Sequence, residues 1–175
     1  MDFIEGLPTS NKQSVILVVV DRLTKYVHFI PLSHPYTAAK IAFLFMQHVF
    51  KLHGLPYSIM SDRDTTFTSY FWQELFIKKG IELAISSAYH PQTNGQIEVV
   101  NRSLEQYLKV FASDKPQQWV DWLPLAEFWF NTNYHTSIHT SPFEALYGYP
   151  PPTLMKYILG ATKVEEVEDH LSQKQ

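Results

Sequence analysis

The stretch VILVVV at residues 15–20 decides the fold class of this 175-residue chain. These consecutive apolar and mostly β-branched residues predict a strand that is covered on both faces, as strands are in the centre of an α/β sheet. A second strand is expected over residues 26–32, after a turn of hairpin size at residues 21–25. The hairpin therefore belongs to the predicted sheet, and Asp2 lies on a further strand ahead of it.

Helical and strand patterns alternate after this hairpin. Apolar residues recur at helical spacing over residues 37–53, before a glycine and a proline that end the helix. A short strand over residues 57–60 then delivers Asp62 at its C-terminal end. A helix over residues 69–79 and a strand over residues 81–85 follow. This order predicts an α/β fold with a mixed five-stranded sheet and helices on both faces.

The next segment changes from a loop to a long helix. Thr93 followed by Gln96 fits a capping box, so the helix is expected to begin at Thr93, with Pro91 blocking regular structure before it. Apolar residues form one stripe of this helix, and Glu98 falls on a second, charged face that points away from the core. A further helix, rich in aromatic residues, is expected over residues 119–131.

Three carboxylates stand at the ends of these elements: Asp2, Asp62 and Glu98, with 35 residues between the last two. Strand ends at a switch point are a usual place for a site in such sheets, and the helix could carry Glu98 over the two aspartates. Without metal the three carboxylates would repel one another, whereas bound cations keep them ionised. Oxygen ligands suit Mg²⁺, and two Mg²⁺ ions about 3.5–4 Å apart stabilise phosphoryl transfer on DNA. The spacing suggests a polynucleotidyl-transferase site that holds two Mg²⁺ ions, for which Mn²⁺ could substitute.

The composition limits the partners of this site. A formal net charge of −3 argues against binding DNA by bulk electrostatics alone, so any DNA contact must be local or shared with other segments. The absence of cysteine excludes disulfides and cysteine-bound zinc within this chain. The longest apolar run is far too short for a membrane helix, and no membrane partner is expected. The length fits one compact domain, taken as residues 1–155, with a polar extension or linker at 156–175.

Five strings carry a resemblance to a known family: DFIEGLP at residues 2–8, VVDRLTK at 19–25, LHGLP at 52–56, SDRD at 61–64 and HPQTNGQIEVVNR at 90–102. On the basis of these strings, the chain closely resembles the integrase catalytic core of gypsy-type LTR retrotransposons, which are relatives of retroviral integrases. The resemblance covers almost all of residues 1–155. The resemblance implies a ribonuclease-H-like fold and DNA integration by two-metal chemistry. In strand transfer, the 3′ hydroxyl of the element cDNA attacks a target phosphodiester, and in 3′-processing water is the nucleophile.

The resemblance also implies roles for single residues. The catalytic residues and metal ligands are Asp2, Asp62 and Glu98. The DNA contacts are Tyr89, Asn94 and Arg102. Glu105 departs from the pattern, because retroviral relatives often have a basic residue seven positions after the glutamate. The implied partners are element and target DNA and further copies of the chain, which would pair through core helices. Action in the nucleus, after a cytoplasmic particle stage, is implied as well.

Two other functions remain open from the sequence. A hydrolase of the ribonuclease H type would share the fold, although a glutamate on a helix in the string PQTNGQIE favours an integrase. A decayed or domesticated copy would act as a non-catalytic DNA-binding or assembly module, and the intact set of carboxylates weakens that alternative. The aromatic residues near 119–130 are interpreted as core, or as a surface between paired cores, rather than as a platform for stacking bases.

Overall fold

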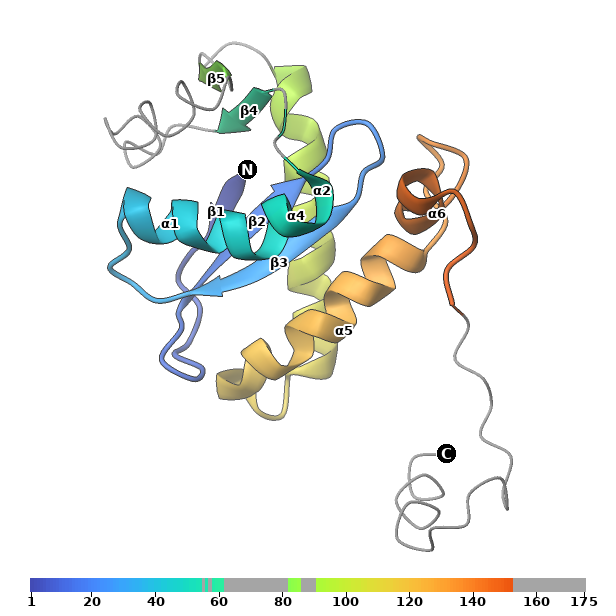
Figure 1. The fold of residues 1–175 in the computed structure, drawn as a ribbon. Helices are drawn as coiled ribbons and strands as arrows, with labels where there is room; N and C mark the ends of the chain where they lie inside the picture. Colours follow the sequence, from blue (N-terminus) through green and yellow to red (C-terminus); the bar gives the residue numbers. More distant parts are fainter. Residues whose placement is uncertain (55, 57, 62–81, 86–90, 153–175) are drawn as a thin grey trace, which may run out of the picture.

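The computed structural model describes residues 1–54, 56, 58–61, 82–85 and 91–152 (Figure 1). Three strands, β1 (Asp2–Ile4), β2 (Val15–Val20) and β3 (Val27–Leu32), form an antiparallel sheet in the order β1-β2-β3. In its register Asp2 lies opposite Val18, and Val18 lies opposite Phe29. The strand pair predicted from VILVVV and its neighbour is confirmed.

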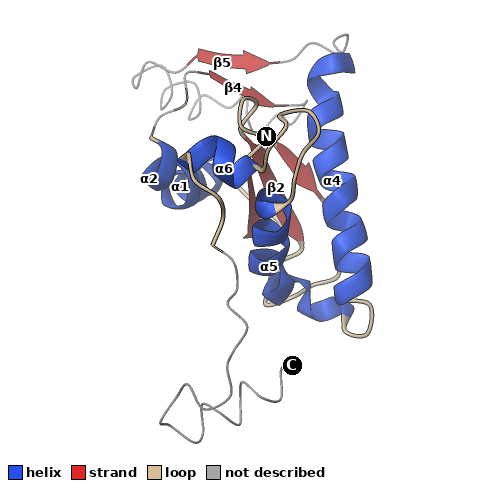
Figure 2. Ribbon diagram, turned by 90° about the vertical axis from the view of Figure 1, so that its right-hand side faces the viewer, coloured by secondary structure: helices blue, strands red, loops and turns tan. Residues whose placement is uncertain are grey.

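Two further strands, β4 (Ser58–Ser61) and β5 (Glu82–Ile85), pair in parallel as a separate two-stranded sheet. Figure 2 shows this pair above the end of the three-stranded sheet. The prediction of one continuous five-stranded sheet is therefore wrong for the described residues, although the five strands and their mixed directions are present. β1 pairs with β2 along one edge, and whether a further strand joins its other edge depends on packing between segments that are distant in the sequence.

The turn between β2 and β3 is held by the carboxylate of Asp21. Its oxygens accept hydrogen bonds from the backbone N–H groups of Leu23 and Thr24, at 3.1 and 3.3 Å, and from the Thr24 hydroxyl at 2.6 Å. Lys25 takes a positive φ of 64° to bring the chain back into β3. Aspartate is suited to this position because its short side chain binds the backbone just after it.

Helices cover both faces of the three-stranded sheet, as Figure 2 shows. Alternate residues of β2 point to opposite faces: Val15, Leu17 and Val19 pack against α1 (Ala38–Phe45), and Ile16 and Val18 face the other core. The second core is formed with buried residues of α4 (Pro91–Phe111) and α5 (Trp119–Thr132). Burial of both faces explains why the strand is a continuous apolar run.

The first helical segment begins where the sequence predicts. The Thr37 hydroxyl caps α1 by accepting a hydrogen bond from the backbone N–H of Lys40 at 3.2 Å. The chain then passes through a π-helix (Met46–Phe50), which the sequence pattern does not predict, into α2 (Lys51–His53). Gly54 ends it with a φ of 73°, a conformation that glycine adopts without a steric penalty.

The start of α4 differs from the expectation. The helix begins at Pro91, two residues before Thr93, so neither the expected start at Thr93 nor a break at Pro91 is correct. Proline is tolerated in the first turn of a helix, because its missing N–H would have no helical partner there. The helix expected over residues 69–79 and the extension at 156–175 lie outside the described residues.

The C-terminal part of the described chain is helical. A 3-10 turn (Pro116–Gln118) leads into α5, and α6 (Pro142–Tyr147) follows. The Ser141 hydroxyl caps α6 by accepting a hydrogen bond from the backbone N–H of Glu144 at 3.1 Å. No helix among the described residues is long and apolar enough to cross a membrane.

Candidate active site

Asp2 lies on β1, half-buried, with both carboxylate oxygens engaged. Its Oδ2 atom accepts a hydrogen bond from Nδ2 of Asn101 at 2.7 Å, and its Oδ1 atom accepts one from the backbone N–H of Phe3 at 2.8 Å. Asn101 belongs to α4, so this bond joins the first strand of the sheet to the long helix across 99 positions of sequence. Asn101 is not among the site residues predicted from the sequence.

Glu98 is exposed on α4, three residues before Asn101. Side chains three positions apart on a helix are neighbours, with about 5–6 Å between their Cβ atoms. Because Asn101 contacts Asp2, this spacing brings Glu98 to the same end of the sheet as Asp2. The predicted orientation of Glu98, away from the buried stripe formed by Val100 and Leu104, is confirmed.

The other predicted site residues are described less completely. Asp62 and Tyr89 lie outside the described residues, although β4 ends at Ser61, immediately before Asp62, as expected. Asn94 lies in the first turn of α4. Arg102 is exposed on α4, four residues after Glu98 and therefore on the same side of the helix.

The donors around Asp2 fit a magnesium ion chemically. The Oδ1 atom of Asn101 is buried and has no hydrogen-bond partner among the described residues, and such an atom costs about 1–3 kcal/mol. The Nδ2 atom of the same Asn101 amide donates to Asp2. The unpaired Oδ1 atom of Asn101 therefore lies near the carboxylate of Asp2. Amide and carboxylate oxygens are the ligands that Mg²⁺ prefers. The described part of the chain has no group of three His, Cys, Asp or Glu that could hold a metal, and Asp62 is not within it.

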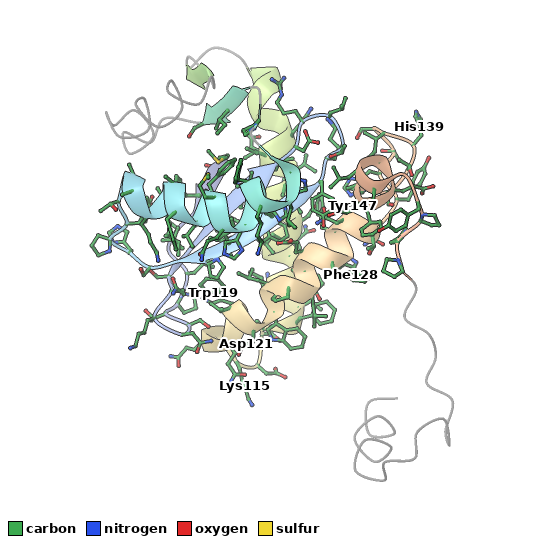
Figure 3. All side chains as sticks on the ribbon, in the orientation of Figure 1. Lys115, Trp119, Asp121, Phe128, His139 and Tyr147 are labelled. Atoms are coloured by element: carbon green, nitrogen blue, oxygen red, sulfur yellow. The ribbon has the colours of Figure 1, made fainter. Side chains whose placement is uncertain are left out.

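The aromatic segment of α5 is divided between core and surface. Trp119 and Phe130 are 2% and 5% exposed, whereas Phe128 and Trp129 are 40% and 43% exposed. Figure 3 marks Trp119 at the start of the helix and Phe128 further along it. The interpretation of these aromatic residues as core is confirmed for Trp119 and Phe130, whereas Phe128 and Trp129 lie at the surface.

The exposed aromatic residues continue onto α4. The ring centroid of Tyr107 lies 4.4 Å from that of Phe111 and 5.3 Å from that of Trp129, and the centroid of Phe111 lies 5.7 Å from that of Trp122. These four residues are called the α4–α5 aromatic surface below. Phe111 is 50% exposed, so the surface is open to a partner.

An α/β core with helices on both faces of its sheet and acidic residues at one end of it has the architecture of a ribonuclease-H-like domain. The sequence model of the family named Integrase core domain matches residues 1–91 of this chain. The chain belongs to that family.

Relatives and solved structures agree with this assignment. The chain is 36% identical over 151 residues to the Transposon Tf2-3 and Tf2-4 polyproteins of Schizosaccharomyces pombe; the match covers 86% of this chain and 11% of those polyproteins. It thus spans about a ninth of the length of these curated relatives. The resemblance to LTR retrotransposon integrase cores is confirmed.

Two solved structures share the fold. The HTLV-2 integrase catalytic core domain, a structure described as in complex with magnesium and trimeric, superposes with a TM-score of 0.65 at 18% identity, covering 82% of this chain and 93% of that one. The simian T-cell lymphotropic virus intasome in complex with a PP2A regulatory subunit gives a TM-score of 0.70 at 19% identity, covering 92% of this chain and 59% of that one. These likenesses confirm the ribonuclease-H-like fold class.

Proposed function

We propose that this chain is the catalytic part of an enzyme that joins retroelement cDNA ends to target DNA, by 3′-processing and strand transfer in the nucleus. The observation that carries the proposal is the bond between Asp2 and Asn101, which fixes one carboxylate of β1 beside the turn of α4 that bears Glu98. Membership of the integrase core domain family supports the reaction class. Asp2, Asp62 and Glu98 are the proposed metal ligands and catalytic residues.

The chain's own residues prepare the site. Asn101 donates to Oδ2 of Asp2 and so orients its carboxylate, while the backbone N–H of Phe3 restrains Oδ1. Glu98, exposed on α4, completes the oxygen donors on the helix side. Two divalent ions, when bound, would supply positive charge for the attacking and leaving oxygens of the phosphodiester. The HTLV-2 integrase core, which was solved in complex with magnesium, supports the choice of metal by analogy.

DNA contacts are proposed at Tyr89, Asn94 and Arg102. Arg102 is exposed on the same side of α4 as Glu98, so it can approach a phosphate near the reacting bond. Glu105 is exposed on the same helix and would repel a neighbouring phosphate. With a net charge of −3, the chain should bind DNA weakly, and added salt should weaken the binding further.

The test is a branched oligonucleotide that reports disintegration, the reversal of joining. This substrate positions its own hydroxyl and phosphate, so it requires less binding energy from the protein than strand transfer does. At low salt the chain should cleave the branch with Mn²⁺, and excess EDTA should abolish the cleavage. Lack of cleavage, even in a protein that carries its natural flanking segments, would favour the second candidate, a non-catalytic DNA-binding or assembly module.

Self-association through core helices is part of the proposal, and the α4–α5 aromatic surface is its expected site. Replacing Trp129 with Lys should shift the chain from dimer to monomer in sedimentation at high protein concentration, because a charge at the centre of an apolar contact is poorly solvated. Tyr134→Lys is the matched control: Tyr134 is 65% exposed and lies beyond the end of α5. A parent protein that stays monomeric at high concentration would refute the proposal.

A further inference from the structure

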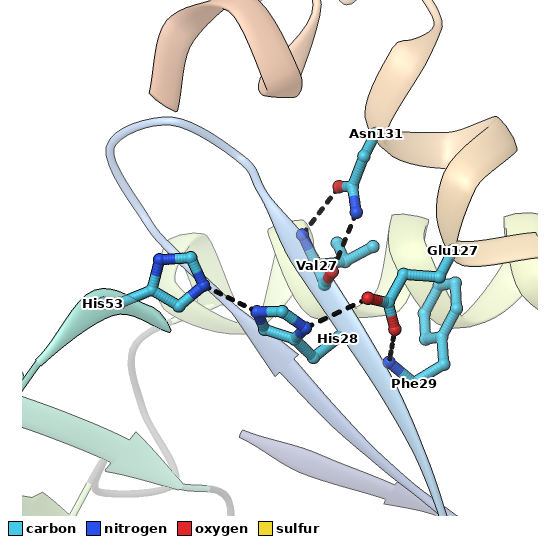
Figure 4. A network of polar contacts seen from close by, with 6 residues as sticks. All are labelled: Val27, His28, Phe29, His53, Glu127 and Asn131. Carbon is cyan, nitrogen blue, oxygen red and sulfur yellow. Dashed lines mark hydrogen bonds and ion pairs between the residues drawn. The ribbon is translucent and has the colours of Figure 1, made fainter. Parts of the chain in front are cut away.

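A buried histidine on β3 is held on both sides of its ring. His28 is 6% exposed, yet its Nδ1 atom lies 3.1 Å from Oε1 of Glu127, and its Nε2 atom lies 2.7 Å from Nε2 of His53 (Figure 4). Glu127 belongs to α5 and His53 to α2. One side chain therefore links the sheet to a helix of each covering layer.

The carboxylate of Glu127 is fixed by the backbone of the same strand. Its Oε2 atom accepts a hydrogen bond from the N–H of Phe29 at 2.9 Å. One turn further along α5, the Asn131 side chain accepts from the N–H of Val27 at 2.8 Å and donates to its carbonyl at 2.9 Å. Glu127 is thus held as an acceptor facing His28, so Nδ1 of His28 must carry a hydrogen.

Only one hydrogen can lie between the Nε2 atom of His28 and the Nε2 atom of His53. If His28 is neutral, its hydrogen is on Nδ1, its Nε2 atom accepts, and Nε2 of His53 donates. If His28 is an imidazolium paired with Glu127, its Nε2 atom donates and His53 must be neutral there. With both rings charged, two N–H groups would face each other across 2.7 Å without an acceptor. The geometry permits one imidazolium in this pair and excludes two.

The surroundings of the pair disfavour a second charge. His53 is exposed on α2, yet partial desolvation lowers its pKa below the usual value and His28 lowers it further, while the carboxylates of Asp21 and Glu127 act in the opposite direction. His48 on the π-helix also has a lowered pKa, first through burial and then through the nearby charge of Lys51.

Uncharged aromatic rings also lie beside the pair. The ring centroid of Tyr26 lies 5.3 Å from that of His28 and 5.7 Å from that of His53, and Tyr147 of α6 lies 5.9 Å from Tyr26. Burial, followed by the influence of Tyr147, raises the pKa of Tyr26 far above its usual value, so this phenol stays protonated in neutral and acidic solution. Because Tyr26 is uncharged, it does not stabilise a charged His53. Asp21 and Glu127 do so, and they therefore reduce the effect of acid on the contact.

We propose that His28 and His53 form a pH-sensitive latch, which fastens α2 to β3 near neutral pH and opens on acidification. His53 ends α2, and in the sequence the next described strand is β4, whose last residue, Ser61, precedes the proposed metal ligand Asp62. The latch depends on the fold and not on DNA joining, and it stands even if the proposed activity is absent.

The direction of the pH effect follows from the pKa of His53. Because this pKa is lower in the folded chain than the value of about 6.5 for an unfolded one, the unfolded chain binds more protons in mild acid. The stabilisation is complete above about pH 6.5 and is lost as the pH falls through that value towards the folded pKa. Acid should therefore lower the melting temperature.

Thermal unfolding between pH 7.5 and 5.5 tests the latch. His53→Gln retains a donor close to the place of Nε2 but cannot gain a proton, so its melting temperature should fall less than that of the parent by about 2–4 °C. His139→Asn is the control: His139 is exposed, and its φ of 54° is one that asparagine tolerates. Comparison in a His48→Gln background removes the other histidine whose pKa is lowered among the described residues. Equal losses in the parent and in His53→Gln would overturn the proposal.

Amide hydrogen exchange of the parent provides a second readout that needs no variant. Protection at residues 51–54 should fall between pH 7.5 and 5.5, after correction for the intrinsic rate, while β2 and α5 keep theirs. The same local loss should be absent from His53→Gln. Uniform loss across the sheet, or none at residues 51–54, would show that no latch opens there.

Discussion

Replacing Glu98 with glutamine should lower the rate of metal-dependent branch cleavage at least about a thousandfold. Metal ions contribute several kcal/mol of charge stabilisation to such a transition state, and each 1.36 kcal/mol corresponds to about tenfold in rate. Glutamine keeps the size of the side chain but removes the charge that holds a cation. Because Glu98 is exposed on α4, the fold should be unaffected. The measurement is the initial rate of oligonucleotide cleavage with Mn²⁺ at low salt.

Two comparisons separate loss of metal from loss of structure. Glu105→Gln removes a carboxylate from the same exposed side of α4 and should retain cleavage, because Glu105 is not one of the proposed metal ligands. Mn²⁺ should raise the melting temperature of the parent and of Glu105→Gln, but not that of Glu98→Gln or Asp62→Asn. Cleavage that survives in Glu98→Gln or Asp62→Asn would assign the activity to another source.

Trp119→Ala should lower the free energy of unfolding by about 3–5 kcal/mol, the usual range when a buried tryptophan is removed. Trp119 is 2% exposed in the core between the sheet, α4 and α5. Its Nε1 atom donates a hydrogen bond of 2.7 Å to the carbonyl of Pro8, so the substitution also leaves that carbonyl without its partner. Urea denaturation measures the loss.

Two variants serve as controls for this prediction. Trp119→Phe keeps an aromatic ring but removes the bond to Pro8, and it should cost clearly less than Trp119→Ala. Trp129→Ala removes a tryptophan that is 43% exposed and should cost least, when measured in dilute protein. If Trp119→Ala were no more destabilising than Trp129→Ala, the position of Trp119 in the core would be wrong.

The elements that the sequence predicts correctly are those with local causes. The β2–β3 hairpin follows from an apolar run and a turn whose aspartate binds its own neighbours. The start of α1 follows from the hydroxyl of Thr37, and α5 lies where an aromatic-rich helix is expected. The start of α4 is predicted two residues too late, because a capping pattern at Thr93 competes with a proline that fits the first turn.

The parts that sequence reasoning misses depend on contacts between distant segments. Whether β4 joins the edge of β1 is decided by three-dimensional packing and not by the pattern of either strand. Asn101 binds Asp2 across 99 positions, and His28 meets Glu127 across a similar separation. The position of Asn101, one helical turn after Glu98, could have indicated from the sequence that it lies close to the site. No periodic feature marks His28 as the partner of His53.

The bonds that Asn131 and Glu127 make with β3 have a consequence for solubility. A sheet ends at each edge in free N–H and C=O groups, which can recruit a strand from another molecule and start aggregation. Asn131 occupies both backbone groups of Val27 as a paired strand would, and Glu127 occupies the N–H of Phe29. Two side chains of a helix thus substitute for a missing strand. The edge of β3 at Val27 and Phe29 is thereby blocked against β-augmentation, although β3 has no strand beyond it in the described part of the chain.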